Sequence, residues 1–131
     1  MSTILVPISP GELLDKITIL RIKLQRMSDP AKLANVRHEL ALLDATWGES
    51  AHVSIDLSAE VQALEAVNAR LWDIEDDIRD HEARHAFDAR FIELARAVYI
   101  NNDERAAIKK RINSRLGSKI VEEKSYKDYR K

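Results

Sequence analysis

The chain has 131 residues, of which 33% are charged, and its formal net charge at pH 7 is -1. The near-neutral charge argues against a protein that attracts nucleic acid through its overall field, and the absence of cysteine excludes disulfides and thiolate catalysis. With only 3 glycines and 3 prolines, the composition favours a single domain built from long amphipathic helices.

The first nine residues are expected to form an extended lead-in, because their short apolar run contains Pro7. They lack the basic and apolar stretches and the cleavage site of a signal peptide. No run in the chain approaches the roughly 20 apolar residues that span a bilayer. We therefore expect a cytoplasmic protein with no membrane insertion.

A helical hairpin is predicted next. Ser9 is placed to cap a helix that begins at Pro10, and the segment 28–30, Ser-Asp-Pro, ends this helix and starts a second one that Gly48 ends. So short a connection makes the two helices antiparallel neighbours. The first helix has a single apolar stripe formed by Leu13, Ile17, Leu20, Leu24 and Met27.

A second hairpin is predicted after a loop at 48–57, which holds at most a short strand at 52–55 that could pair with the lead-in. Ser58 is expected to cap a third helix reaching about Arg84, and Asp88 a fourth that Gly117 ends. The polar stretch 101–103 interrupts the apolar stripe of the fourth helix and predicts a kink or a new helix start there.

These elements predict an all-α fold, a four-helix bundle made of two helical hairpins. Residues 1–131 are expected to form one domain, with the extended lead-in at 1–9. A C-terminal tail at 118–131 is expected to fold back on the bundle.

Residues 81–85 read HEARH, the His-Glu-x-x-His pattern in which His81 and His85 would bind zinc while Glu82 polarises a water. A zinc hydrolase needs a third protein ligand, which the sequence does not offer nearby, and charged residues flank the pair. We therefore interpret the segment as a solvated helix end and expect no metal there.

The third helix is strongly acidic and carries Asp73, Glu75, Asp76, Asp77 and Asp80. Carboxylates one turn apart could hold Mg²⁺ between helices, as in all-α nucleotide pyrophosphohydrolases, and Glu12 with Asp15 supplies another such pair. Because this spacing is common on charged helices, a solvated face is the simpler interpretation. Mg²⁺ is thus expected only if the protein acts on a nucleotide or a phosphorylated sugar.

A polar layer is predicted halfway along the bundle. If the third and fourth helices pack antiparallel about residue 86, Asn68 lies level with Arg105, while Arg21 and His38 lie at a similar height on the first two helices. A buried Arg105 without a partner would be costly, so it should find Asp103, a carboxylate of the third helix or a ligand anion. The layer could fix the register of the bundle or line a ligand pocket.

The end of the fourth helix and the tail are rich in basic residues interleaved with tyrosines. Nucleic-acid binding is not expected, because cations near a helix C-terminus are favoured by its dipole and the isoelectric point is about 6.4. In the predicted bundle this basic end meets the acidic first turn of the first helix, where Lys16 can reach either carboxylate or a partner. We expect the site or interface at this meeting point.

Three stretches, PISPGELLDKITIL at 7–20, the region from LWDIEDDIRD to NNDERAAIKKRIN, and VEEKSY at 121–126, together resemble an uncharacterised family of short bacterial helical proteins, a domain of unknown function. The resemblance covers nearly the whole chain and implies no activity. Members of that family are often encoded near surface-polysaccharide and glycosyltransferase genes, which implies a context without a mechanism. The HEARH segment is not part of the family pattern.

We expect a non-enzymatic interaction or accessory module with a protein partner or self-association, and no cofactor. The alternative is a Mg²⁺-dependent enzyme or binder that acts on a nucleotide or phosphorylated sugar. The candidate ligand- or partner-binding residues are Glu12, Asp15, Lys16, Asn68, Trp72, Glu75, Asp76, Arg79, Asn102, Asp103, Arg105, Lys109, Glu122, Glu123 and Tyr126.

Overall fold

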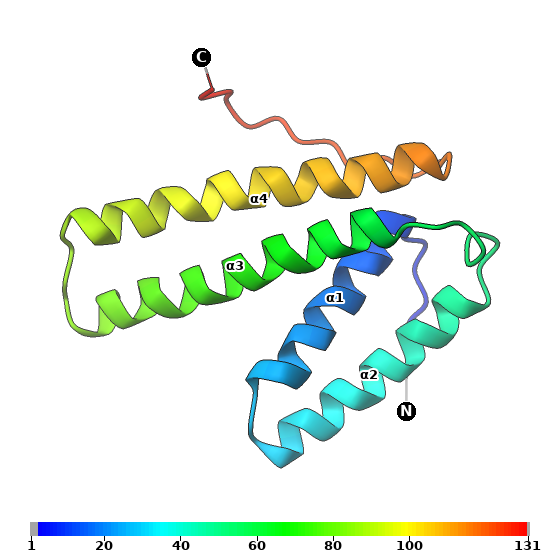
Figure 1. The fold of residues 1–131 in the computed structure, drawn as a ribbon, viewed down its shortest axis with the longest axis horizontal. Helices are drawn as coiled ribbons and strands as arrows, with labels where there is room; N and C mark the ends of the chain where they lie inside the picture. Colours follow the sequence, from blue (N-terminus) through cyan, green and yellow to red (C-terminus); the bar gives the residue numbers. More distant parts are fainter. Residues whose placement is uncertain (1–2, 131) are drawn as a thin grey trace.

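The computed structural model describes residues 3–130, and it contains four helices (Figure 1): α1 (Pro10–Arg26), α2 (Pro30–Gly48), α3 (Ser58–Ala83) and α4 (Ala89–Arg115). Within these residues there is no strand, so the strand considered at 52–55 is wrong, because this segment forms turns and a bend. No helix in the described chain is long and apolar enough to cross a membrane. The prediction of an all-α fold made of two hairpins is confirmed.

Polar side chains fix where the helices begin. Ser9, Asp29 and Asp88 each accept a hydrogen bond from a backbone N–H in the first turn of α1, α2 and α4. The caps Ser9 and Asp88 are as predicted, and Asp29 is the residue of the segment 28–30 that caps α2. The predicted cap of α3, Ser58, is wrong, because Ser58 is the first residue of the helix itself. The Asp56 carboxylate accepts a hydrogen bond of 3.0 Å from the Ser58 backbone N–H.

The two hairpins lie at an angle to each other, and α1 packs against all three other helices, whereas α2 packs only against α1 (Figure 1). The single apolar stripe predicted for α1 is therefore incomplete, since this helix is buried on several faces. Arg21 and His38, which were predicted to lie at the height of the polar layer, are both exposed. The buried residues of α1 are Gly11, Leu13, Leu14, Asp15, Ile17, Thr18, Leu20 and Ile22.

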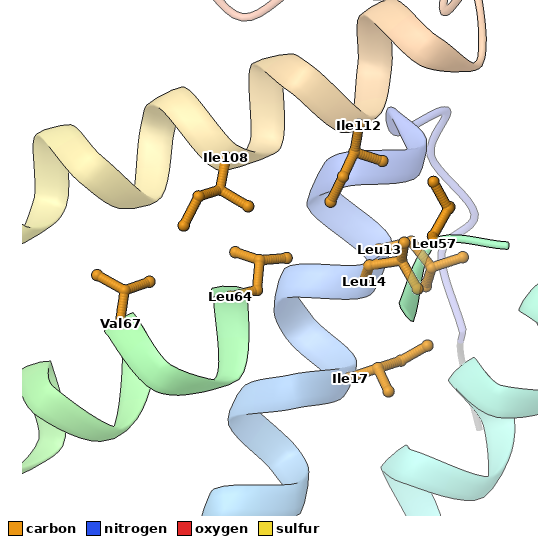
Figure 2. Close-up of a cluster of buried hydrophobic side chains, with 8 residues drawn as sticks. All are labelled: Leu13, Leu14, Ile17, Leu57, Leu64, Val67, Ile108 and Ile112. Carbon is orange, nitrogen blue, oxygen red and sulfur yellow. The ribbon is translucent and has the colours of Figure 1, made fainter. Parts of the chain in front are cut away.

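The hydrophobic core lies where α1 crosses the α3–α4 hairpin (Figure 2). Side chains of α1 meet Leu64 and Val67 of α3 and Ile108 and Ile112 of α4, all of which are almost completely inaccessible to solvent. Because this contact holds the first turns of α1 against the second half of α4, it also brings the charged residues of those segments together.

Gly11 sets how closely α1 approaches α4. A Cβ atom at this position would lie 2.7 Å from the backbone oxygen of Lys109 and 2.9 Å from Oδ1 of Asn113, so only glycine fits without a shift. The Gly11 backbone N–H donates a hydrogen bond of 2.7 Å to the same Asn113 oxygen. The two helices therefore touch at backbone distance just before the acidic turn of α1.

The helix α4 runs without a break through residues 101–103, so a new helix start at this stretch is wrong. Asn101 is accommodated because its amide donates to the Ala97 carbonyl oxygen and its Oδ1 accepts from Arg70 of α3. After α4, Gly117 adopts a φ of 63° and reverses the chain. The tail then runs back along α4 (Figure 1), which confirms the predicted folding back.

Candidate functional site

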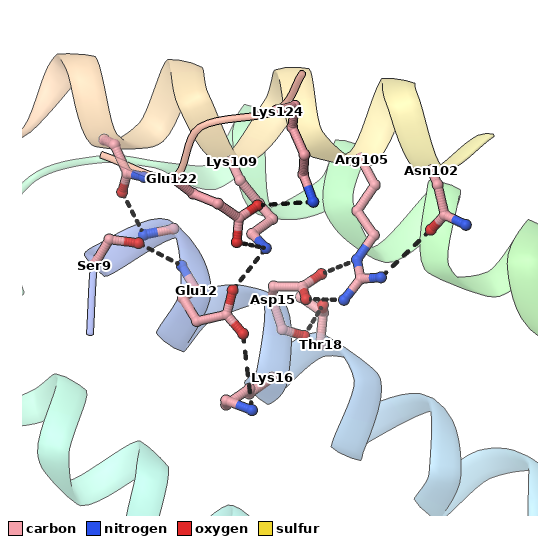
Figure 3. A network of polar contacts seen from close by, with 12 residues as sticks. Ser9, Glu12, Asp15, Lys16, Thr18, Asn102, Arg105, Lys109, Glu122 and Lys124 are labelled. Atoms are coloured by element: carbon pink, nitrogen blue, oxygen red, sulfur yellow. Dashed lines mark hydrogen bonds and ion pairs between the residues drawn. The ribbon is translucent and has the colours of Figure 1, made fainter. Parts of the chain in front are cut away.

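The centre of the site is an ion pair between Arg105 of α4 and Asp15 of α1 (Figure 3). Arg105 Nε donates a hydrogen bond of 2.9 Å to Oδ1 of Asp15, and Nη2 pairs with the other carboxylate oxygen. The Asp15 side chain is 1% exposed and that of Arg105 is 29% exposed. Hydrogen bonding to Asp15 raises the pKa of Arg105 above its ordinary value despite partial burial.

Two further polar side chains complete the surroundings of Asp15. The Asn68 amide of α3 donates hydrogen bonds of 2.9 Å to Oδ1 of Asp15 and 3.0 Å to the Thr18 hydroxyl. Thr18 in turn donates to the Asp15 backbone oxygen at 2.8 Å. The polar layer with Asn68 level with Arg105 is therefore confirmed, but its centre is Asp15 of α1, which was not among the partners predicted for Arg105 in that layer.

A second ion pair lies one helical turn further along α4. Lys109 Nζ is 2.6 Å from Oε2 of Glu12, and its side chain is 12% exposed. Lys16 lies 3.8 Å from the other Glu12 oxygen. The predicted meeting of the acidic start of α1 with the basic half of α4 is confirmed. Arg105 and Lys109 of α4 are each held in place by a carboxylate of α1 (Figure 3).

An open pocket of about 570 Å³ lies above these ion pairs, between α4 and the tail, and we call it the Arg105 pocket. Arg105 and Lys109 contribute to it from α4 and Glu12 from the start of α1. Its charged, polar and aromatic lining residues are Glu12, Tyr99, Asn102, Asp103, Arg105, Lys109, Glu122, Lys124, Tyr126, Lys127 and Tyr129.

The tail forms one wall of the Arg105 pocket through a few contacts. The Tyr129 ring packs edge-on against Tyr99 with 5.0 Å between ring centroids, and the nearby Asp103 carboxylate raises the pKa of the Tyr129 hydroxyl. At the other end of the wall, Lys124 lies 5.9 Å from the centre of the Tyr126 ring. Both tyrosines of the tail therefore shape this wall.

Arg105 and Asn102 also line a second, shallower pocket of about 350 Å³, together with Ile19 and Leu71. The acidic-helix candidates Trp72, Glu75, Asp76 and Arg79, with Asn68, lie in this second pocket and not in the Arg105 pocket.

Three candidates line neither pocket, and one of them is Asp15, the buried partner of Arg105. Lys16 is exposed beside Glu12, and Glu123 faces a groove on the other side of the tail. Sequence reasoning missed Thr18, Tyr99, Lys124, Lys127 and Tyr129, although the spacing of tyrosines and lysines in the tail was a usable signal.

The acidic residues of α3 are largely paired with arginines. Asp73 lies 2.6 Å from Arg26, Glu75 pairs with Arg79, and Asp80 lies 3.0 Å from Arg84. Across residues 3–130, no group of three or more His, Asp or Glu side chains is arranged to hold a metal ion.

The HEARH segment spans the end of α3. The helix ends at Ala83, and His85 has a φ of 52°, a left-handed conformation that terminates helices. The two histidines therefore do not share a helical face as the zinc hypothesis requires. His81 Nδ1 lies 3.0 Å from the Asp77 carbonyl oxygen and Nε2 3.7 Å from Asp88, which agrees with a helix end.

Comparison with known proteins gives one match. The model of a family described as a family of unknown function (DUF6165) matches residues 4–129. No curated protein and no solved structure matches the chain.

Proposed function

Because the chain belongs to DUF6165, whose function is unknown, we propose its function from the site itself: a non-enzymatic binding module that takes a small polar ligand in the Arg105 pocket. The volume of about 570 Å³ lies within the roughly 300–1,000 Å³ typical of small-molecule sites.

The observation that carries this proposal is the fixed floor of the pocket. Asp15 holds Arg105 and Glu12 holds Lys109, so both cationic groups are positioned before any ligand arrives. Side chains that folding has already ordered lose little further conformational entropy when a ligand binds, and this strengthens the association. Above this floor, Tyr99, Tyr126 and Tyr129 offer ring faces and edges to the remainder of a ligand.

Binding is favoured over catalysis by the chemistry of the lining. Among the described residues that line the Arg105 pocket there is no serine, threonine, cysteine or histidine, the usual nucleophiles and bases. The carboxylates at its floor are engaged by Arg105 and Lys109. A Mg²⁺-dependent reaction on a nucleotide or phosphorylated sugar is kept as the alternative.

A thermal-shift screen tests the proposal. Nucleotides, sugar phosphates and their unphosphorylated counterparts are added at millimolar concentration, with and without Mg²⁺, to the wild type and to Tyr126→Ala. We expect at least one compound to raise the melting temperature of the wild type without Mg²⁺. The shift should shrink in Tyr126→Ala, because Tyr126 lines the pocket while its side chain is 79% exposed and not needed for folding.

The matched control is Phe87→Ala, which removes an exposed aromatic ring between α3 and α4, at the far end of α4 from the pocket. This variant should keep the full ligand shift. If no compound stabilises the wild type, or if Tyr126→Ala and the wild type show equal shifts in melting temperature, the result counts against binding in the Arg105 pocket. A shift that requires Mg²⁺ would favour the enzymatic alternative.

Self-association is a second candidate role, supported by the lead-in before α1. Ile4, Leu5 and Val6 are 83%, 90% and 66% exposed, in an extended segment with no strand beside it in the described chain. Two such segments from two copies can pair edge to edge. We expect sedimentation velocity to show a mass that rises with concentration and a smaller rise for Leu5→Lys; a monomeric wild type at high concentration contradicts this role.

A further inference from the structure

The Glu122 carboxylate of the tail occupies a cationic corner of the Arg105 pocket. Its Oε1 lies 3.2 Å from Lys124 Nζ and its Oε2 lies 3.8 Å from Lys109 Nζ (Figure 3). Hydrogen bonding to Lys124 and the positive charges of Lys109 and Arg105 lower the pKa of Glu122. A negative group is thus already favoured at this point of the pocket.

Glu122 is nevertheless a weakly held occupant. Its side chain is 48% exposed, and it belongs to a tail without helix or strand. The distance of 3.8 Å to Lys109 is too long for a hydrogen bond, and exposed ion pairs contribute little to stability.

The cations around Glu122 retain donor capacity that a carboxylate does not use. Arg105 turns Nε and Nη2 toward Asp15, while Nη1 has only a contact of 3.5 Å with Asn102. Lys109 has one close acceptor, Glu12, for its three N–H groups. An anion with more oxygens and more charge than a carboxylate would satisfy these groups better.

We propose that Glu122 is an internal substitute for a phosphoryl group, and that a phosphate monoester or diphosphate displaces it and binds Lys109, Lys124 and the free edge of Arg105. This inference rests on the proposed binding role of the Arg105 pocket. A phosphoryl group carries close to two negative charges and three acceptor oxygens, so it can reach all three cations at once. The sugar or base attached to it then lies against the tyrosines of the pocket, where aromatic rings stack well.

Isothermal titration calorimetry on the full chain tests the inference with pyrophosphate, a nucleoside diphosphate, a hexose 1-phosphate, and the uncharged nucleoside and hexose. Each probe is titrated into the wild type, Glu122→Gln and Glu123→Gln. The two variants remove one negative charge from adjacent tail positions, but Glu123 lies outside the Arg105 pocket. Glu123→Gln therefore controls for the change in net charge.

We expect the phosphorylated probes to bind Glu122→Gln about three- to fivefold more tightly than the wild type, because the competing carboxylate is gone. Glu123→Gln should change the affinity by less than about twofold at physiological salt. The probe that binds best identifies the source of the phosphoryl group, whether a nucleotide, a sugar phosphate or the free anion.

Three results would overturn the inference. Equal gains in both variants would show that only net charge matters, and weaker binding to Glu122→Gln would show that Glu122 contacts the ligand. Tight binding of an uncharged probe that phosphorylation does not improve would leave the binding role intact and contradict phosphoryl recognition. If no probe binds any of the three proteins, the proposed function fails together with this inference.

Discussion

Replacing Arg105 with methionine is expected to lower the free energy of unfolding by about 3 kcal/mol, toward the lower end of the values for breaking a buried ion pair. Methionine keeps much of the side-chain length but leaves the Asp15 carboxylate, which is 1% exposed, without its counter-ion. Asn68 alone remains to donate to that carboxylate from a neighbouring helix. Urea unfolding at pH 7 measures the change.

The control for Arg105→Met is Arg70→Met, which breaks an ion pair with Glu104 between α3 and α4. Both side chains of that pair are about half exposed, so its loss should change stability by less than about 1 kcal/mol. Adding Asp15→Leu to Arg105→Met should restore most of the lost stability, because no buried charge then remains. Similar losses in the two single variants would show that the burial of Asp15 is not the decisive feature.

Gly11→Ala is the second change with a large expected effect, a loss of about 1–3 kcal/mol from overpacking. The added methyl group would lie 2.7 Å from the Lys109 backbone oxygen, and the backbone of α4 cannot move aside as a flexible side chain could. Since α1 must shift, Glu12 should also separate from Lys109. Thermal unfolding measures the loss of stability, and titration of any ligand found in the screen measures the effect on the pocket.

Gly48→Ala is the matched control for Gly11→Ala. Gly48 is the last residue of α2, and a Cβ atom there would meet nothing within 4 Å. Alanine at this position should be neutral or stabilise the helix by up to about 1 kcal/mol, because glycine loses more backbone freedom on folding. If both variants change stability in the same direction and by the same amount, the close contact of α1 with α4 is not what requires glycine at position 11.

The helix boundaries were predictable because they depend on neighbours in the sequence. Ser9, Asp88 and Gly117 act within one turn of their own position, and the structure places them as predicted. It was also predictable that Asn68 and Arg105 lie at the same height along the α3–α4 hairpin, since a short connection fixes the register of an antiparallel hairpin. The meeting of opposite charges likewise located the site near the start of the first helix and the end of the fourth.

The partner of Arg105 was not predictable in the same way. It depends on how one hairpin crosses the other. The contact of Gly11 with Asn113 of α4, 102 positions away in the sequence, determines this crossing. Helical periodicity indicates that a helix has an apolar stripe, but not that it lies at the centre of the fold. A usable signal existed, because Leu14 and Ile22 lie outside the predicted stripe of α1 and imply burial on additional faces.

The walls of the Arg105 pocket come from segments that lie far apart in the sequence. Glu12 stands near its beginning, the α4 residues follow almost 90 positions later, and Tyr129 lies close to the last described residue. During synthesis the pocket therefore cannot exist until the residues around Tyr129 have left the ribosome. A ligand cannot guide the early folding of such a protein; it recognises only the finished molecule, and its binding energy adds to the stability of the whole fold.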